Sequence, residues 1–194
     1  FPIRLLYVNW LLTIVVIEKY LYTRFIIFFF NDTATTEIYT LSLHDALRSK
    51  RKLYLGGITI PYHLGLSGHS DGDSVLHALI DSLLGACKLK DIGTLFSDKN
   101  YKYKNIRSTK LLENVVSLIK SKNYSINNID INVIAQKPKI KKYKNKMIKV
   151  ISKIFKINPK QINIKGKTTE KLGIIGKEKA IAAEVIASVI KYDE

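Results

Sequence analysis

Residues 74–87 read SVLHALIDSLLGAC, and this stretch decides the fold of the chain around it. Its apolar residues recur every three or four positions, which is the spacing of one face of an amphipathic helix. Asp73 or Ser74 stands where an N-cap is needed, because a short polar side chain can accept a hydrogen bond from a free backbone amide there. The spacing therefore predicts a helix over residues 74–87 with one apolar face to bury.

Strands and further helices are predicted on both sides of this segment. Residues 53–60 (LYLGGITI) are β-rich around two glycines and predict a short hairpin closed by Pro61. Helical spacing returns in residues 108–122, 143–155 and 178–190, and apolar–polar alternation predicts strands over residues 129–135 and 161–167. We expect one α+β domain, a two-layer sandwich with helices packed on one face of a mixed sheet.

The composition suits a folded domain with a strongly basic surface. The 194 residues are 46% hydrophobic and carry a formal charge of +16. Such a charge admits a nucleic-acid or anionic-membrane partner. Lysine is frequent together with Asn and Ile, as in residues 137–149 (KPKIKKYKNKMIK), and no recognisable binding module accompanies it. The high lysine content is therefore better explained by A/T-rich codon usage and a solvated basic face. We expect no nucleic-acid or membrane partner.

Cys87 is the single cysteine of the chain. It excludes an internal disulfide framework and suits a reducing compartment. Its place on the apolar side of the predicted helix favours a packing role over a nucleophile.

The first 49 residues differ in character from the rest. Their apolar runs, residues 5–17 and 25–30, end before the ~20 residues that a membrane-spanning helix needs. Residues 31–47 (NDTATTEIYTLSLHDAL) resemble the translation of a common short-read sequencing adapter. We expect residues 1–49 to be an artefactual or chimeric leader and residues 50–194 to be the functional domain. The alternative is a genuine apolar leader.

The densest group of titratable side chains lies in residues 68–81, GHSDGDSVLHALID. Asp73, His77 and Asp81 follow one another at intervals of four and so share a helix face. A carboxylate beside a histidine can hold its second ring nitrogen, which suits a metal or phosphate site. Helix capping and a solvated surface explain the same residues equally well, because two histidines eight apart are not a zinc motif.

A second group lies in residues 165–176, KGKTTEKLGIIG. Hydroxyls and backbone amides suit phosphate oxygens, and Glu170 suits a hard cation such as Mg²⁺. Taken alone, the segment is better interpreted as a polar turn interrupted by glycine.

Three segments together, in this order and at these separations, resemble one family: residues 56–98, 129–140 (IDINVIAQKPKI) and 167–173 (KTTEKLG). The family is 2-C-methyl-D-erythritol 2,4-cyclodiphosphate synthase, and the resemblance extends over residues 51–191. It implies a phosphorus–oxygen lyase of non-mevalonate isoprenoid precursor synthesis. The substrate would be 4-diphosphocytidyl-2-C-methyl-D-erythritol 2-phosphate, cyclised with release of CMP. The resemblance also implies a homotrimer, and we expect it in bacterial cytoplasm.

The resemblance assigns site residues as well. His77 would bind zinc, and Glu170 would bind Mg²⁺ or Mn²⁺. Thr168 and Glu170 would be catalytic residues. Asp73 and Asp81 would support the metal-binding residues without touching the substrate. The methylerythritol phosphate end would lie against His69, Ser70, Asp91, Gly93, Phe96 and Asp98. The cytidine and diphosphate end would lie against Ala135, Pro138, Lys139, Lys141, Thr168, Thr169, Ile174 and Lys177.

The chain departs from the family pattern at two places. The zinc-binding Asp-x-His pair should stand shortly before residues 52–57 and is absent. A zinc site reduced to His77 binds weakly, so we expect this chain to be inactive or nearly so. Ile174 and Lys177 replace a frequent Phe and Arg, and lysine lacks the bidentate fork of arginine.

Two other classes of protein remain open from the sequence. One is a non-catalytic trimeric relative that binds cytidine nucleotides. The other is a basic protein that binds nucleic acid or a membrane surface.

Overall fold

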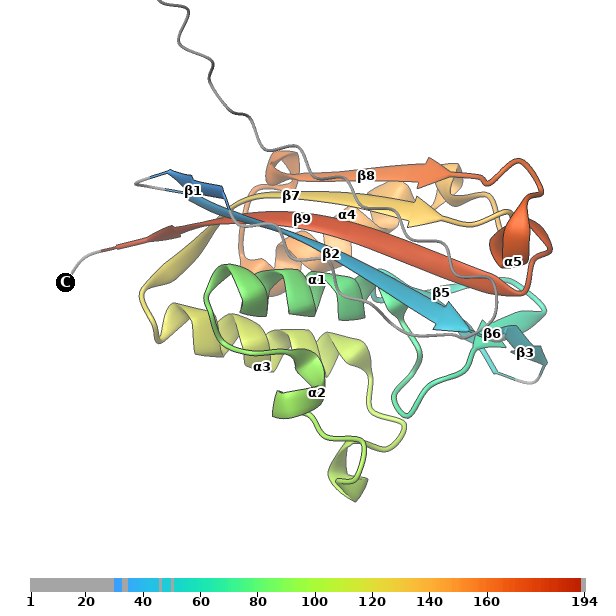
Figure 1. Ribbon diagram of the computed structural model, residues 1–194, viewed down its shortest axis with the longest axis horizontal. Helices are drawn as coiled ribbons and strands as arrows, with labels where there is room; N and C mark the ends of the chain where they lie inside the picture. The colour runs from blue at the N-terminus through green and yellow to red at the C-terminus, as the bar shows by residue number, and fades with distance from the viewer. Residues whose placement is uncertain (1–29, 33–34, 46, 50, 193–194) are drawn as a thin grey trace, which may run out of the picture.

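A five-stranded mixed sheet forms the centre of the protein (Figure 1). The computed structural model describes residues 30–32, 35–45, 47–49 and 51–192, with side chains from Arg51 onward. The strand order is β1-β2-β9-β7-β8, and only β7 and β8 run parallel. The strands are β1 (Phe30–Asp32), β2 (Thr35–Asp45), β7 (Tyr124–Ile134), β8 (Ile162–Lys167) and β9 (Ala180–Lys191). The predicted α+β architecture with a mixed sheet is confirmed.

Three helices cover one face of this sheet (Figure 1). They are α1 (Ser74–Ala86), α3 (Ser108–Lys120) and α4 (Lys144–Phe155), each within two residues of its predicted bounds. Helix α1 packs against β9 and β2 and is buried along almost its whole length. Its C-cap Cys87 is buried in the core cluster, as expected for a packing residue. None of the helices formed by the described residues is both long enough and apolar enough to cross a membrane.

The prediction of a helix over residues 178–190 is wrong. This segment is the strand β9, hydrogen-bonded to β2 on one side and β7 on the other. It lies inside the sheet and is buried on both faces, so apolar residues occupy successive positions and the alternation of a half-buried strand is lost. Such a run cannot be distinguished from a buried helix by periodicity alone.

The predicted hairpin is confirmed as β4 (Leu53–Leu55) and β5 (Ile58–Ile60). Gly56 and Gly57 make its turn with φ of 59° and 80°, values that glycine adopts without strain. A second pair joins β3 (Leu47–Ser49) to β6 (Leu64–Leu66). Short helical turns that the sequence did not predict complete the fold: α2 (Ile92–Leu95), α5 (Gly173–Gly176), and the 3-10 turns at Tyr101–Tyr103, Ile140–Lys142 and Pro159–Gln161.

Part of the segment predicted to be an artefactual leader belongs to the sheet. Strand β2 pairs with β9 from Thr36, opposite Val189, to Asp45, opposite Ala180, whereas residues 1–29 lie outside the described residues. Backbone hydrogen bonds to a free strand edge do not depend on side-chain identity. The pairing is therefore compatible with either origin of the segment, and the boundary at residue 49 stays a prediction.

Candidate active site

The loop before helix α1 forms one side of a cavity of about 240 Å³, here called the histidine cavity. Residues 92–106, which include α2, form the opposite wall. The cavity is lined by Gly68, His69, Ser70, His77, Ile92, Gly93, Phe96, Asp98, Tyr103, Ile106 and Leu111. The structure thus brings together most of the residues assigned to the methylerythritol phosphate end.

His77 meets two hydroxyl groups at the floor of this cavity. Its Nε2 lies 3.0 Å from Ser70 Oγ and 3.0 Å from Ser108 Oγ. The Ser108 hydroxyl also donates to the carboxylate of Asp71. The imidazole is therefore tied to both the loop before α1 and the first residue of α3, although Ser108 is far from it in sequence.

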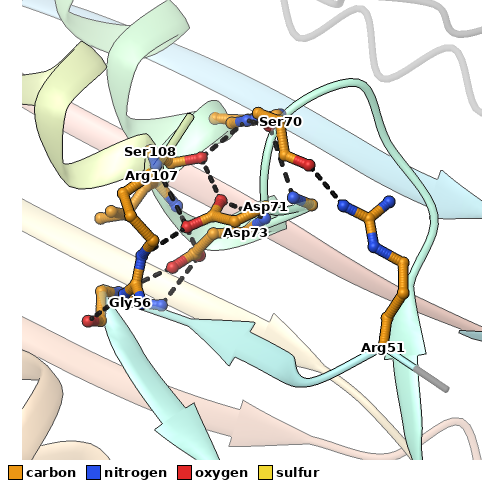
Figure 2. Close-up of polar contacts among 11 residues, drawn as sticks. Arg51, Gly56, Ser70, Asp71, Asp73, Arg107 and Ser108 are labelled. Atoms are coloured by element: carbon orange, nitrogen blue, oxygen red, sulfur yellow. Dashed lines mark hydrogen bonds and ion pairs between the residues drawn. The ribbon is translucent and has the colours of Figure 1, made fainter. Parts of the chain in front are cut away.

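Asp71 fastens the loop to the start of α3 (Figure 2). Its buried carboxylate accepts the Ser108 backbone N–H at 3.1 Å and lies 3.0 Å from Arg107 Nε. Two backbone bonds run alongside, from Asn105 N–H to the His69 carbonyl at 2.8 Å and from Asp71 N–H to the Ile106 carbonyl at 3.0 Å. These contacts fix the loop that carries His69 and Ser70.

Asp73 joins the β4–β5 hairpin to helix α1. Its fully buried carboxylate accepts N–H donors from Gly56 at 2.9 Å, Gly57 at 2.7 Å and Leu76 at 3.1 Å, which confirms it as the N-cap. Burial, followed by the charge of Asp71, raises the pKa of Asp73 to about 6 against the opposing effect of the amides. The carboxylate thus supports the site by holding the hairpin and the helix together.

Asp81 anchors the opposite wall in the same manner. Its carboxylate accepts the Ile92 N–H at 2.8 Å, which attaches the short helix α2 to α1. Burial raises the pKa of Asp81 to about 6, the Ile92 amide lowers it, and the charge of Asp91 raises it.

Arg51 holds the loop from outside (Figure 2). Its guanidinium donates to the Gly68 carbonyl at 2.7 Å and to the Ser70 carbonyl at 2.6 Å. Arg107 acts from the other side, donating to the Gly57 carbonyl at 3.0 Å and stacking 3.9 Å above the Tyr54 ring. Sequence reasoning missed Arg51, Arg107 and Ser108, because no local spacing links them to the loop.

Asp91 does not line the histidine cavity. Its carboxylate caps α2, accepting the Thr94 N–H at 2.7 Å and the Thr94 hydroxyl at 3.1 Å. Asp98 does line the cavity, yet it is 87% exposed and its carboxylate is 3.9 Å from His69 Nδ1, which makes their contact weak. Tyr103, which the sequence did not single out, packs edge-on against Phe96 with 5.4 Å between ring centroids.

A second cavity of about 260 Å³, here called the lysine cavity, lies where the ends of β7 and β8 meet the start of α4. It is lined by Ala135, Lys139, Ile140, Lys141, Lys144, Gly166, Lys167 and Thr168. Ala135, Lys139, Lys141 and Thr168 were assigned from the sequence, whereas Lys144 and Lys167 were not. A Cβ on Gly166 would lie 3.0 Å from Ile140 Cβ, so glycine at this position lets the Ile140 side chain pack closely against β8.

The segment after β8 carries the remaining assigned residues. Thr168 Oγ1 donates to Glu170 Oε1, and Thr169 Oγ1 donates to the Leu172 carbonyl at 2.8 Å. Glu170 is exposed and has a left-handed φ of 49°. Pro138 is buried beside the lysine cavity, while Ile174 and Lys177 are exposed and line neither cavity.

The described residues do not complete a metal site. Within residues 51–192, no three or more His, Cys, Asp or Glu side chains lie close enough together to hold an ion. Two hydroxyl groups lie beside His77 Nε2, whereas a zinc site takes three or four nitrogen, sulfur or carboxylate ligands.

Two cavities, one lined by polar and aromatic groups and one by lysines, suit a protein that binds a small phosphorylated molecule. The chain belongs to the YgbB family, whose pattern matches residues 39–190. It is 49% identical over 146 residues to the 2-C-methyl-D-erythritol 2,4-cyclodiphosphate synthase of Brachyspira hyodysenteriae, covering 75% of this chain and 92% of that one. The family resemblance of the sequence is confirmed.

Two further relatives extend the comparison. The bifunctional enzyme IspD/IspF of Pelagibacter ubique is 65% identical over 143 residues, which is 74% of this chain but only 38% of that protein. The structure of IspF from Plasmodium falciparum in complex with CDP superimposes with a TM-score of 0.72 at 40% identity, covering 84% of this chain and all of that one.

Proposed function

We propose that this domain converts 4-diphosphocytidyl-2-C-methyl-D-erythritol 2-phosphate into 2-C-methyl-D-erythritol 2,4-cyclodiphosphate and CMP. The observation that carries the proposal is the gathering of the assigned residues into two cavities, with His69, Ser70 and Phe96 in one and Lys139 and Thr168 in the other. The name of the Brachyspira relative and the CDP bound to the Plasmodium structure support it.

In this proposal the substrate's own 2-phosphate oxygen attacks the β-phosphorus of its diphosphate, and the bond to CMP breaks. No covalent bond to the protein is needed. The barrier comes from bringing two anions together, so catalysis depends on positioning and on neutralising charge. His69 and Ser70 would hold the 2-phosphate end, and Lys139, Lys141 and Thr168 would hold the diphosphate.

The proposal includes metals and an oligomer. Zinc at His77 and Mg²⁺ or Mn²⁺ at Glu170 would neutralise further charge, as the resemblance implies. Because His77 is the one zinc ligand assigned here, we propose that the chain as written turns over slowly or not at all.

A homotrimer in the cytoplasm is proposed on the same grounds. The sheet face opposite the helices carries paired polar side chains, such as Asn132 donating to Glu184 at 2.8 Å, and α1, α3 and α4 do not cover it. Light scattering of the purified chain tests the trimer.

A single substitution tests the zinc argument. Strand β2 ends at Asp45, and Leu47 begins β3 opposite Leu66, two residues before Gly68. Leu47→His would therefore create an Asp-x-His pair near the loop of the histidine cavity. We expect zinc retained after dialysis and CMP formation at least about ten-fold above the unaltered chain. Substantial CMP formation with retained zinc by the unaltered chain would show the predicted inactivity to be wrong.

A non-catalytic cytidine-nucleotide-binding protein is the second candidate. It is favoured by a contrast within the described residues: four lysines line one cavity, whereas no three potential metal ligands lie together. Binding of CDP without CMP formation, in both the unaltered chain and Leu47→His, would support this candidate over the enzyme.

A further inference from the structure

Three successive peptide groups in the loop before α1 are fixed through their carbonyl oxygens. Arg51 donates to the Gly68 carbonyl at 2.7 Å and to the Ser70 carbonyl at 2.6 Å. The His69 carbonyl between them accepts the Asn105 N–H at 2.8 Å. These peptide bonds are trans, and a trans peptide holds its N–H opposite its carbonyl. The bound carbonyls therefore set the directions of the N–H groups that follow them.

The backbone N–H groups of His69 and Ser70 have no acceptor within residues 51–192. Ser70 is 6% exposed and His69 is half-buried, and an N–H without an acceptor is costly in such surroundings. Both residues line the histidine cavity. Successive backbone N–H groups that lack protein acceptors can bind an anion, so these two are candidates for that role.

Arg51 approaches this loop from the side away from Ser108 (Figure 2). Ser108 contacts His77, which lines the histidine cavity. The His69 N–H lies opposite the carbonyl that Arg51 holds, so it points away from Arg51 and toward the cavity. Asp98 is the acidic residue among those that line the cavity, and it is 87% exposed, so water screens its charge from an anion bound there.

The peptide between Gly68 and His69 depends on Arg51 for its orientation. Gly68 has no Cβ, so rotation of this peptide meets little steric resistance. Within residues 51–192, Arg51 is the group that donates to the Gly68 carbonyl. The two peptides that follow are also held by backbone bonds to residues 105–106. Loss of Arg51 should therefore free the one peptide that carries the His69 N–H.

We propose that Arg51 is a positioning residue for anion binding in the histidine cavity. Its guanidinium holds the Gly68 carbonyl outside the cavity and so keeps the His69 N–H, beside that of Ser70, turned toward a phosphate group of the ligand. The positive charge strengthens both hydrogen bonds, and the planar fork reaches two carbonyls at once. This inference rests on the proposed function only for the identity of the phosphorylated ligand.

Isothermal titration of the full chain with 2-C-methyl-D-erythritol 2,4-cyclodiphosphate, the proposed product, tests this role without requiring turnover. We expect Arg51→Met to weaken binding about five- to ten-fold, the effect of one misdirected hydrogen bond to a charged group. CDP binding should change less than about two-fold, because Arg51 holds the loop of the other cavity. Arg51→Lys keeps a cationic donor without the fork and should bind with an affinity between the two.

The amide resonances of His69 and Ser70 distinguish positioning from a general loss of stability. In the unaltered chain, saturating ligand should move the His69 amide proton downfield, because it enters a hydrogen bond to a phosphate oxygen. Saturated Arg51→Met should lack this shift, while the dispersion of its other amide resonances shows that the domain is folded. A ligand that shifts neither amide in the unaltered chain would overturn the proposal.

Lys52→Met is the matched control, because Lys52 is the next residue, carries the same charge and is exposed. An equal loss of cyclodiphosphate affinity in Lys52→Met would reduce the effect to overall charge and overturn the proposal. So would a loss of CDP affinity in Arg51→Met as large as its loss of cyclodiphosphate affinity.

Inorganic phosphate separates this inference from the proposed function. The unaltered chain could bind phosphate, with a His69 amide shift that Arg51→Met removes, yet fail to bind the cyclodiphosphate. That result would support the anion site and contradict the proposed function. Cyclodiphosphate binding that Arg51→Met leaves unchanged would overturn the inference alone. If the unaltered chain binds neither phosphate nor the cyclodiphosphate, the inference is wrong.

Discussion

The two cavities of this protein are built in opposite ways. The histidine cavity is held by buried, paired groups, with Asp71 and Asp73 each accepting hydrogen bonds from more than one segment. The lysine cavity is lined by four lysines that form no ion pair within residues 51–192, beside Ala135 and Ile140. A paired network fixes geometry, whereas unpaired cations supply an electric field. The first cavity should therefore be sensitive to the loss of its supports, and the second to charge and salt.

The largest expected effect is on stability, from Asp73→Ala. This substitution removes the N-cap of α1 and leaves the Gly56, Gly57 and Leu76 amides without their acceptor. We expect a loss of about 2–4 kcal/mol in the free energy of unfolding, measured by urea titration. Asp73→Asn, which retains one acceptor, should lose less.

The same variant tests whether the two cavities are independent. At a temperature where Asp73→Ala is folded, its CDP affinity should equal that of the unaltered chain, because Asp73 contacts neither the lysines nor Gly166. A loss of CDP affinity in the folded variant would mean that the two cavities are coupled through the domain.

A smaller effect is expected from Arg51→Met. The Gly68 and Ser70 carbonyls lose two charge-assisted donors, so the loop should open more often. We expect hydrogen exchange in residues 68–71 to become about five- to ten-fold faster, a change of about 1–1.4 kcal/mol in local stability. Lys52→Met, on the next residue, is the control and should exchange as the unaltered chain does. Unchanged exchange in Arg51→Met would show that the backbone bonds to residues 105–108 hold the loop without it.

The smallest effect, per pH unit, is the pH dependence of stability. Burial raises the pKa of Asp81 in the folded state to about 6, above its ordinary value of 3.8. The folded protein therefore binds this proton more tightly than the unfolded chain does, so the contribution of Asp81 to stability is present at low pH and declines as pH rises from about 4 through 6.

Urea titrations of the unaltered chain and Asp81→Asn between pH 4.5 and 7.5 measure this contribution. The stability of the unaltered chain relative to Asp81→Asn should fall with rising pH by less than about 1 kcal/mol per pH unit. A relative stability that rises with pH would contradict the raised pKa. The affinity of the lysine cavity for CDP should not change in Asp81→Asn.

Secondary structure was predicted correctly for elements whose apolar and polar positions follow a recognisable spacing. The N-cap Asp73, the glycine hairpin and the three amphipathic helices follow from the spacing of apolar residues and the conformational freedom of glycine. The prediction for residues 178–190 was wrong, because a strand such as β9 that is buried on both faces has few polar positions to mark its period.

The candidate site was predicted in part. His69, Ser70, Phe96 and Lys139 were found because they belong to segments that resemble a family. Arg51 and Lys144 were not, since each belongs to a separate element and no spacing in the sequence relates them to the others. Lys167 was not singled out either, although it begins the segment 167–173 that resembles the family.

The sequence by itself determined the class of fold, the positions of helices α1, α3 and α4 and the family, because helical periodicity, capping and motif spacing are local properties of the chain. Only the tertiary structure decided that β9 lies inside the sheet, that Asp71 meets Ser108, and that four lysines share one hollow. These pairings join residues far apart in the chain, and they form because burial of the apolar faces brings their elements together.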